Sequence, residues 1–249
     1  MSPNPIAVAW SMLRALRVRR PVPADTSAAT VDHSSLAGAL ATLASQGIES
    51  VDARTLLTYR DELAATDPND LSSDVALAYW LNLYNAGALE LATRAASQSA
   101  STVLRVPGAF DSTWATVAGE ALSLNDIEHG KIRRFKDPRI HAALVCGSAS
   151  CPTLRLTPYS GEHLQNELDD QMRAFLRDGG LVFDDGSAQL SRILLWYGAD
   201  FVRPSRMPNI LPVRRRQVAA ALQQWTEVPL AGTPIEFQPY DWALSCSIG

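Results

Sequence analysis

The sequence predicts an α+β domain, with helices in its N-terminal part and strands interleaved with helices afterwards. Leu36, Leu40 and Leu43 recur at helical spacing before Gly47, and a second helical pattern covers 53–65. Beyond Arg105 the apolar pattern shortens to strand-length runs separated by turn residues. Segregated helical and strand-containing regions are typical of the α+β class.

The composition is that of a folded globular protein. Of 249 residues, 47% are hydrophobic and 19% are charged, whereas disordered chains are poorer in apolar groups and richer in charge. A formal net charge of -4 provides no overall basic field, so we expect no nucleic-acid partner. The length fits one main domain over residues 31–249, preceded by a basic amphipathic segment and linker over residues 1–30.

The N-terminal segment has an apolar run at 6–16 that precedes its arginines, which is the reverse of a secretory signal. The run is also shorter than the roughly 20 apolar residues that span a bilayer. Residues 6–20 can form a basic amphipathic helix that contacts an anionic membrane surface or a partner protein. The alternatives are a frayed leader or a helix docked on its own domain. With three cysteines, too few for a disulfide scaffold, these features predict a cytoplasmic protein.

The most uniformly apolar helical segment is VALAYWLNLYNAGALELATRAA, residues 75–96. We expect it to be a central helix packed on a mixed or antiparallel sheet. Asn82 and Asn85 stand three positions apart on it, so both project near one face. A buried amide costs about 1–3 kcal/mol unless it is hydrogen-bonded. The two asparagines therefore either hold a neighbouring loop or line a binding site.

The remaining elements follow from turn and capping signals. Two short strands surround Ala118 and Gly119, and Ser123 with Asp126 can cap a helix over 124–135. We expect an apolar strand over 139–146, a helix over about 161–177 and a hairpin turn at 184–186 between the runs 180–183 and 188–197. A last helix over 213–227 and a terminal strand around 235–244 complete the prediction.

The stretch RIHAALVCGSASCPTLR, residues 139–155, carries a histidine and two cysteines. On one strand, His141 and Cys146 would lie roughly 16 Å apart on opposite faces, so they could not act as base and nucleophile for each other. Cys151 follows a turn that can bring it near either residue. Five interpretations remain: a catalytic thiolate, inert buried thiols, a structural disulfide, a redox-active pair, or a zinc site completed by His129 or His141.

Glu128 and His129 form a second polar cluster on the helix predicted over 124–135. Adjacent residues on a helix point about 100° apart, so one can face a cleft while the other holds a loop. Alternatively, Glu128 and His129 cap the end of this helix at the protein surface. The chain has no phosphate-binding glycine motif and no Gly-x-Ser-x-Gly, so we expect no nucleotide and no other cofactor.

Several motifs together resemble one known family. YWLNLYNA, LNDIEHGKIR, DPRIHAALVCGSASCPTLR, LLWYGADF and YDWAL resemble, in this order from Val31 to Leu244, domain of unknown function 547. The resemblance implies an α+β domain found in bacterial proteins and in plant proteins, and it marks a set of residues: Asn82, Asn85, Glu128, His129, His141, Cys146, Cys151, Pro152, Trp196, Asp200, Tyr240, Asp241 and Trp242. The order of a central helix before a histidine-bearing strand is distantly similar to papain- and transglutaminase-like thiol hydrolases, but this central helix carries asparagines and no cysteine.

The first functional hypothesis is a thiol-dependent hydrolase or acyltransferase acting on peptide or amide bonds. Cys146 or Cys151 would be the nucleophile and His141 or His129 the base, with Glu128 or Asp200 orienting the imidazole. The predicted substrate-binding residues are Asn82, Asn85, Arg155 and Asp200, with asparagine amides stabilising the oxyanion. The substrate would be a small molecule or a peptide. The alternatives are a non-catalytic binding or scaffold module and a Cys/His metal-binding domain.

Overall fold

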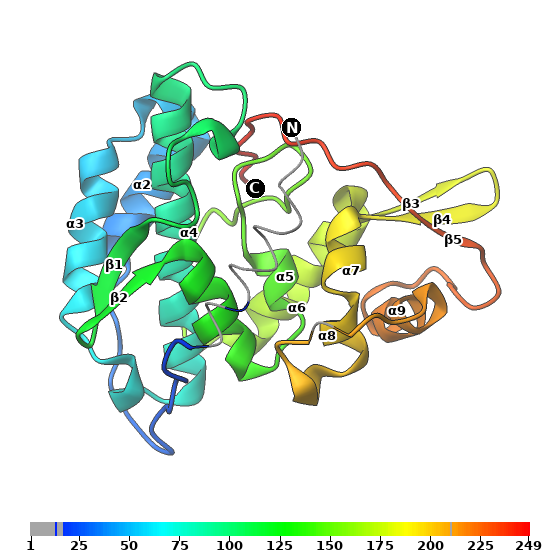
Figure 1. Ribbon diagram of the computed structural model, residues 1–249, viewed down its shortest axis with the longest axis horizontal. Helices are drawn as coiled ribbons and strands as arrows, with labels where there is room; N and C mark the ends of the chain where they lie inside the picture. The colour runs from blue at the N-terminus through cyan, green and yellow to red at the C-terminus, as the bar shows by residue number, and fades with distance from the viewer. Residues whose placement is uncertain (1–12, 14–16, 210) are drawn as a thin grey trace.

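The computed structural model describes residues 13, 17–209 and 211–249 (Figure 1). The N-terminal half contains α2 (Ser34–Gln46), α3 (Ala53–Ala64), α4 (Ser73–Ser97) and the hairpin β1 (Thr113–Val117) and β2 (Glu120–Ser123). Helical segments η4 (Asp126–Lys131) and η5 (Ile132–Phe135), helix α5 (Ile140–Ala143), helix α6 (Leu164–Phe175) and segment η6 (Leu176–Gly180) follow. The C-terminal half contains β3 (Leu181–Asp184), β4 (Ser187–Leu190), α7 (Arg192–Trp196), α8 (Gly198–Val202), α9 (Arg215–Leu222) and β5 (Ile235–Phe237). Helices and small sheets together confirm the α+β class.

Helix α4 is the central helix that the sequence predicts. Every residue from Ala76 to Ala92 is buried, because the segment is apolar on nearly all sides, and its polar residues Asn82, Asn85 and Glu90 are buried with it. Its neighbours are mainly helices: α3 on one side, and α6 and the segments η4 and η5 on the other. The expected packing on a mixed or antiparallel sheet is limited to close contact with the small antiparallel β1–β2 hairpin, where Trp114 and the adjoining Leu124 lie against Gly87.

Two hydrophobic cores meet near the middle of the molecule. The larger core surrounds α4 and includes Leu164 and Leu168 of α6. The smaller core contains Met172 and Phe175 of the same helix and extends to β4, α7 and α9. Helix α6 therefore connects the two halves, which lie on opposite sides of it in Figure 1.

The hairpin turns agree with the sequence prediction. Ala118 and Gly119 have φ of 48° and 74°, and Asp185 and Gly186 have φ of 44° and 76°. Two successive positive φ values are the signature of the tight turn that best joins antiparallel strands. Strands β3 and β4 pair antiparallel, and β4 pairs parallel with β5, so the second sheet is mixed.

Three predicted strands are shorter than expected or absent. The run 139–146 forms helix α5 at Ile140–Ala143 and not a strand, which corrects the opposite-face argument for His141 and Cys146. The run 188–197 leaves β4 at Leu190 and becomes α7, whose N-cap Ser191 accepts a hydrogen bond from the Ile193 amide. The terminal strand stops at Phe237, and the chain beyond it runs back toward α4 (Figure 1).

Most of the predicted amphipathic helix over 6–20 lies outside the described residues. The described part contacts the domain: the Arg19 amide donates to Glu120 Oε1 at 3.0 Å, and Lys131 Nζ donates to the Arg19 carbonyl at 2.7 Å. Further along, the Ala24 amide donates to the Leu71 carbonyl at 2.9 Å. The boundary near residue 30 stays a prediction. None of the helices described has the length and apolar character that a membrane span requires.

Candidate functional site

The two cysteines of the central motif lie at the ends of a tight turn. Cys146 and Cys151 are joined by a disulfide, with their Cα atoms 6.4 Å apart. Gly147 makes the turn with φ of 77°, and a Cβ at this position would lie 3.2 Å from Val103 Cγ1. The turn therefore sits directly against the N-terminal core, in a conformation that favours glycine.

The C-terminal segment holds this turn by backbone hydrogen bonds. The Ala149 amide donates to the Ala243 carbonyl at 2.9 Å, and the Ser245 amide donates to the Gly147 carbonyl at 3.1 Å. The pairing continues to the end of the chain, where the Leu154 amide donates to the Ser247 carbonyl at 2.9 Å. This arrangement places Tyr240, which is far away in sequence, beside the cysteines.

Hydrogen-bond donors converge on Cys151. Its Sγ accepts from the Cys146 amide at 3.1 Å and from Ser148 Oγ at 3.3 Å, and the Tyr240 hydroxyl lies 3.4 Å away. Ser148 and Tyr240 are also hydrogen-bonded to each other at 2.6 Å. Burial raises the pKa of Tyr240 to about 12, with Ser148 acting in the opposite direction, so the phenol keeps its proton at neutral pH.

A small cavity opens beside Cys151. Its volume is about 160 Å³, below the roughly 300 Å³ at which ligand pockets begin, so it fits one side chain rather than a whole small molecule. Polar groups dominate its wall, including Ser191, Arg192 and Gln238. Cys151 lines this cavity, but Cys146 does not.

A buried charged network lies between the two cores. The Arg133 guanidinium donates from Nε to Asp200 Oδ2 at 2.8 Å, and His141 Nε2 lies 3.0 Å from the same oxygen. The Asn209 amide donates to the other oxygen, Oδ1, at 3.0 Å. Burial opposes ionisation of Asp200, but His141 and Arg133 together hold its pKa below its usual value.

Glu128 and His129 extend the network toward the aromatic residues. The Tyr197 hydroxyl donates to Glu128 Oε1 at 2.7 Å, and the Tyr84 hydroxyl donates to Oε2 at 3.3 Å. His129 Nδ1 lies 3.3 Å from Arg133 Nη1. Burial lowers the pKa of His129 to about 4 and also lowers the pKa of His141, so both imidazoles are neutral at pH 7.

The structure brings together some of the predicted catalytic residues and separates others. His141 and Asp200 form the predicted imidazole–carboxylate pair. The sulfur atoms of Cys146 and Cys151 have Ser148, Tyr240 and the Cys146 amide as hydrogen-bond partners. Within the described part of the chain, neither His129 nor His141 has a hydrogen bond to either sulfur. The predicted catalytic roles of these residues stay predictions.

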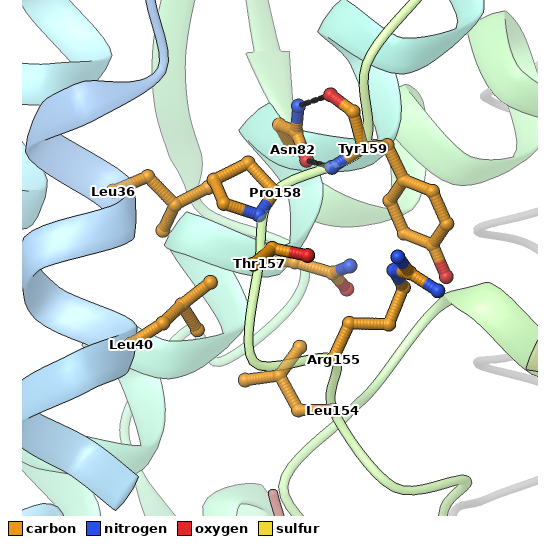
Figure 2. A pocket seen from close by; sticks show the side chains of 9 residues that line it. Leu36, Leu40, Asn82, Leu154, Arg155, Thr157, Pro158 and Tyr159 are labelled. Atoms are coloured by element: carbon orange, nitrogen blue, oxygen red, sulfur yellow. Dashed lines mark hydrogen bonds between the residues drawn. The ribbon is translucent and has the colours of Figure 1, made fainter. Parts of the chain in front are cut away.

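Asn82 and Asn85 each hold a loop through their side-chain amides. Asn82 exchanges two hydrogen bonds with the backbone of Tyr159, at 2.8 and 2.9 Å (Figure 2). Asn85 donates to the Ala143 carbonyl at 3.0 Å and accepts from the Val145 amide at 3.1 Å, which fixes the backbone entering the cysteine turn. These contacts are those expected of loop anchors. The predicted role of both residues in substrate binding stays a prediction.

Arg155 lines a second, much smaller cavity together with these asparagines (Figure 2). Its volume is about 10 Å³, roughly the space of one water molecule. The Arg155 guanidinium lies over the Tyr159 ring at 5.2 Å and 3.6 Å from Glu167 Oε1. In the structure Arg155 thus contacts Tyr159 and Glu167, and its predicted role in substrate binding stays a prediction.

Sequence reasoning missed the roles of Ser148, Arg133 and Tyr197. Ser148 stands between the two cysteines, which was a usable signal, and Arg133 follows His129 at helical i,i+4 spacing. Tyr197 stands within the motif LLWYGADF, but nothing in the sequence marks it as the partner of Glu128. No three His, Cys, Asp or Glu side chains gather as metal ligands would within the residues that the structure describes.

Comparison with known families adds one finding. Residues 68–176 match the family model described as "Protein of unknown function, DUF547". This match supports the resemblance to the DUF547 family over these residues. The matched part contains α4, Glu128 and His129, the cysteine turn and all of α6, whereas Asp200 and Tyr240 lie beyond it. No curated protein and no solved structure matches the chain, so the likeness to papain and transglutaminase is not confirmed.

Proposed function

We propose that this domain carries out thiol–disulfide exchange at the Cys146–Cys151 pair. The observation that carries the proposal is the position of Cys151, which is bonded to Cys146, lines a cavity and has a backbone amide and two hydroxyl groups within hydrogen-bond distance of its sulfur. Once the pair is reduced, the same donors stabilise a thiolate at Cys151, because hydrogen bonds to an ionised acceptor are stronger than those to a neutral one. Cys151 is therefore the sulfur that exchanges with substrate.

The reaction is a two-electron exchange with a substrate dithiol. A substrate thiolate attacks Cys151 Sγ, the bond between Cys151 and Cys146 breaks, and the electron pair leaves on Cys146 as a thiolate. The second substrate thiolate then attacks the substrate sulfur of the mixed disulfide and releases Cys151 as a thiolate. The substrate is oxidised to a disulfide and the pair is reduced to a dithiol. Because the donors favour the reduced form of Cys151, we expect the pair to act as an oxidant.

This proposal also bears on the predicted location. Permanent disulfides are rare in the cytoplasm, but transient catalytic ones occur there. A redox-active pair is therefore compatible with the predicted cytoplasmic location. The third cysteine, Cys246, does not compete near neutral pH, because burial raises the pKa of its thiol to about 11.

The thiol-dependent hydrolase or acyltransferase remains the second candidate, since it uses the same sulfur. The position of Cys151 beside a cavity of side-chain size supports it, since reduction of the disulfide frees a thiol there. It also requires an acceptor for the thiol proton, and the described residues place hydroxyl groups rather than an imidazole at the sulfur. A distant likeness to papain- or transglutaminase-like enzymes belongs to this candidate.

Trapping a mixed disulfide tests the main proposal. The Cys146→Ser variant is incubated with oxidised glutathione near pH 7, and the adduct on Cys151 is followed by intact-mass spectrometry. We expect it to form at least tenfold faster than the adduct on Cys146 in the Cys151→Ser variant, because only Cys151 lines the cavity and has the full donor set. Equal rates, or reaction of either variant only in denaturant, would contradict the proposal.

Tyr240→Phe tests the role of the donors. A hydrogen bond to a charged group contributes about 1.5–3 kcal/mol, so its removal should raise the pKa of reduced Cys151 by about one unit or more in an alkylation–pH profile. Tyr159→Phe is the matched control, because the buried Tyr159 hydroxyl has no hydrogen-bond partner within the described structure. Turnover of a peptide thioester by the reduced protein, without consumption of a dithiol, would favour the hydrolase.

A further inference from the structure

Three aromatic rings gather on the surface beside the disulfide. Trp196 ends α7, and Tyr240 and Trp242 lie in the segment after β5. The ring centroids are 4.8 Å apart for Trp196 and Tyr240, 4.4 Å for Tyr240 and Trp242, and 5.7 Å for Trp196 and Trp242. We call these three residues the aromatic patch.

The exposed part of the patch is Trp196, whereas Tyr240 and Trp242 are half-buried. Trp196 is 43% exposed, and its neighbour Leu195 is 42% exposed. Large aromatic side chains are usually buried, and exposed clusters of them mark binding surfaces. Packing within the domain therefore does not account for the exposed part of the patch.

The patch is continuous with the disulfide and its cavity. The Tyr240 hydroxyl lies 3.4 Å from both sulfur atoms, while its ring packs against the two tryptophans. Arg192, at the start of α7, and Pro239, directly before Tyr240, line the cavity beside Cys151. The same two elements thus form the wall of the cavity and carry the aromatic patch.

We propose that the aromatic patch binds the apolar or aromatic side chain next to the reacting cysteine of an extended peptide substrate. The inference rests on the proposed thiol–disulfide exchange and names its substrate class. A cavity of about 160 Å³ accepts the substrate cysteine alone, so the neighbouring side chain must lie outside it. The aromatic patch is the apolar surface that the substrate meets there, and aromatic side chains stack on such rings at centroid distances of about 4.5–7 Å.

The test compares two dithiol peptides with the full-length protein. In one peptide each cysteine is flanked by Trp, and in the other by Ser. With the unchanged protein we expect the second-order rate constant for oxidation of the Trp peptide by the Cys146–Cys151 disulfide, measured in a single turnover, to exceed that of the Ser peptide by about tenfold, the effect of one good apolar contact. The ratio should fall to about one in Trp196→Ala combined with Trp242→Ala, and it should be largely kept when both are changed to Phe.

Phe183→Ala is the matched control, because Phe183 is an exposed ring, 44% accessible, on strand β3 outside the patch. It should leave the ratio unchanged. A ratio near one in the unchanged protein, or a high ratio that survives the double Ala variant, would overturn the inference. Oxidation of glutathione by the disulfide is measured in parallel. If it occurs without peptide preference, only the subsite fails, whereas its absence counts against thiol–disulfide exchange itself.

Discussion

At the level of single residues, Asp200 is the carboxylate that holds the buried charged network together. Its side chain is fully buried, and it is the acceptor for Arg133, His141 and the Asn209 amide. Arg133 is itself 2% exposed, so its charge has little access to water. The buried charge of Arg133 therefore needs Asp200 as its counter-ion, because a buried charge without a counter-ion strongly destabilises the fold.

We therefore expect Asp200→Ala to lower the free energy of unfolding by about 3–5 kcal/mol, since it leaves the Arg133 guanidinium buried without a counter-ion. Urea unfolding followed by far-UV circular dichroism measures the change. Asp178→Ala is the control: Asp178 pairs with Arg177 at 2.8 Å on the surface, where such pairs contribute less than about 1 kcal/mol. Similar losses in both variants would show that the buried network is not the cause.

At the level of elements, close approach explains the glycine in the middle of α4. A Cβ on Gly87 would lie 2.5 Å from Leu124 Cδ2 and 2.9 Å from Trp114 Cδ2. Helix α4 can thus pack tightly against the β1–β2 hairpin. Gly38 in α2 is different, because no atom lies within 4 Å of the position a Cβ would take.

The two glycines should respond to substitution in opposite directions. Gly87→Val should destabilise the protein by about 1–3 kcal/mol, because the added methyl groups overpack the contact with the hairpin. Gly38→Ala should stabilise it by about 0.5–1 kcal/mol, because alanine loses less backbone entropy in a helix and meets no obstacle. Thermal unfolding of both variants tests these predictions: Tm should fall in Gly87→Val and rise in Gly38→Ala. A stabilised Gly87→Val would refute the packing argument.

Elements with strong local signals were predictable, and those governed by distant contacts were not. Helices α2, α3 and α4 and both hairpin turns follow from apolar spacing and turn residues, which act locally. The run at 140–145 was ambiguous, because a short apolar stretch fits a buried strand or a buried helix equally well. Its two alanines favour a helix intrinsically, and α5 forms there.

The candidate site was predictable in its parts but not in its arrangement. The sequence singles out both cysteines, His141 and Asp200 as residues that carry chemistry. It contains no local signal for the contact between Tyr240 and Cys151, which are 89 positions apart. That contact depends on the C-terminal segment pairing with the cysteine turn through backbone hydrogen bonds, which any sequence can form.

At the level of the whole molecule, buried neutral histidines should make the fold sensitive to acid. Burial lowers the pKa of His129 to about 4 and that of His33 to about 4, and it also lowers the pKa of His141. In an unfolded chain these imidazoles titrate near pH 6.5. Between pH 6.5 and 4 the unfolded state therefore binds more protons than the folded state, so stability falls as the pH falls.

His129 is the residue with which to test this sensitivity, because Glu128, Arg133, His141 and Asp200 all act on it. A shift from about 6.5 to about 4 corresponds to roughly 2–3 kcal/mol lost between pH 7 and 4. His129→Gln, which cannot titrate, should remove that part of the loss when urea unfolding is repeated at several pH values across the range. His163→Gln, a change at an imidazole whose side chain is 64% exposed, is the control for replacing a histidine outside the buried network. An unaltered slope in His129→Gln would mean that the acid sensitivity over this range comes from the other buried imidazoles, His33 and His141, whose pKa values burial also lowers.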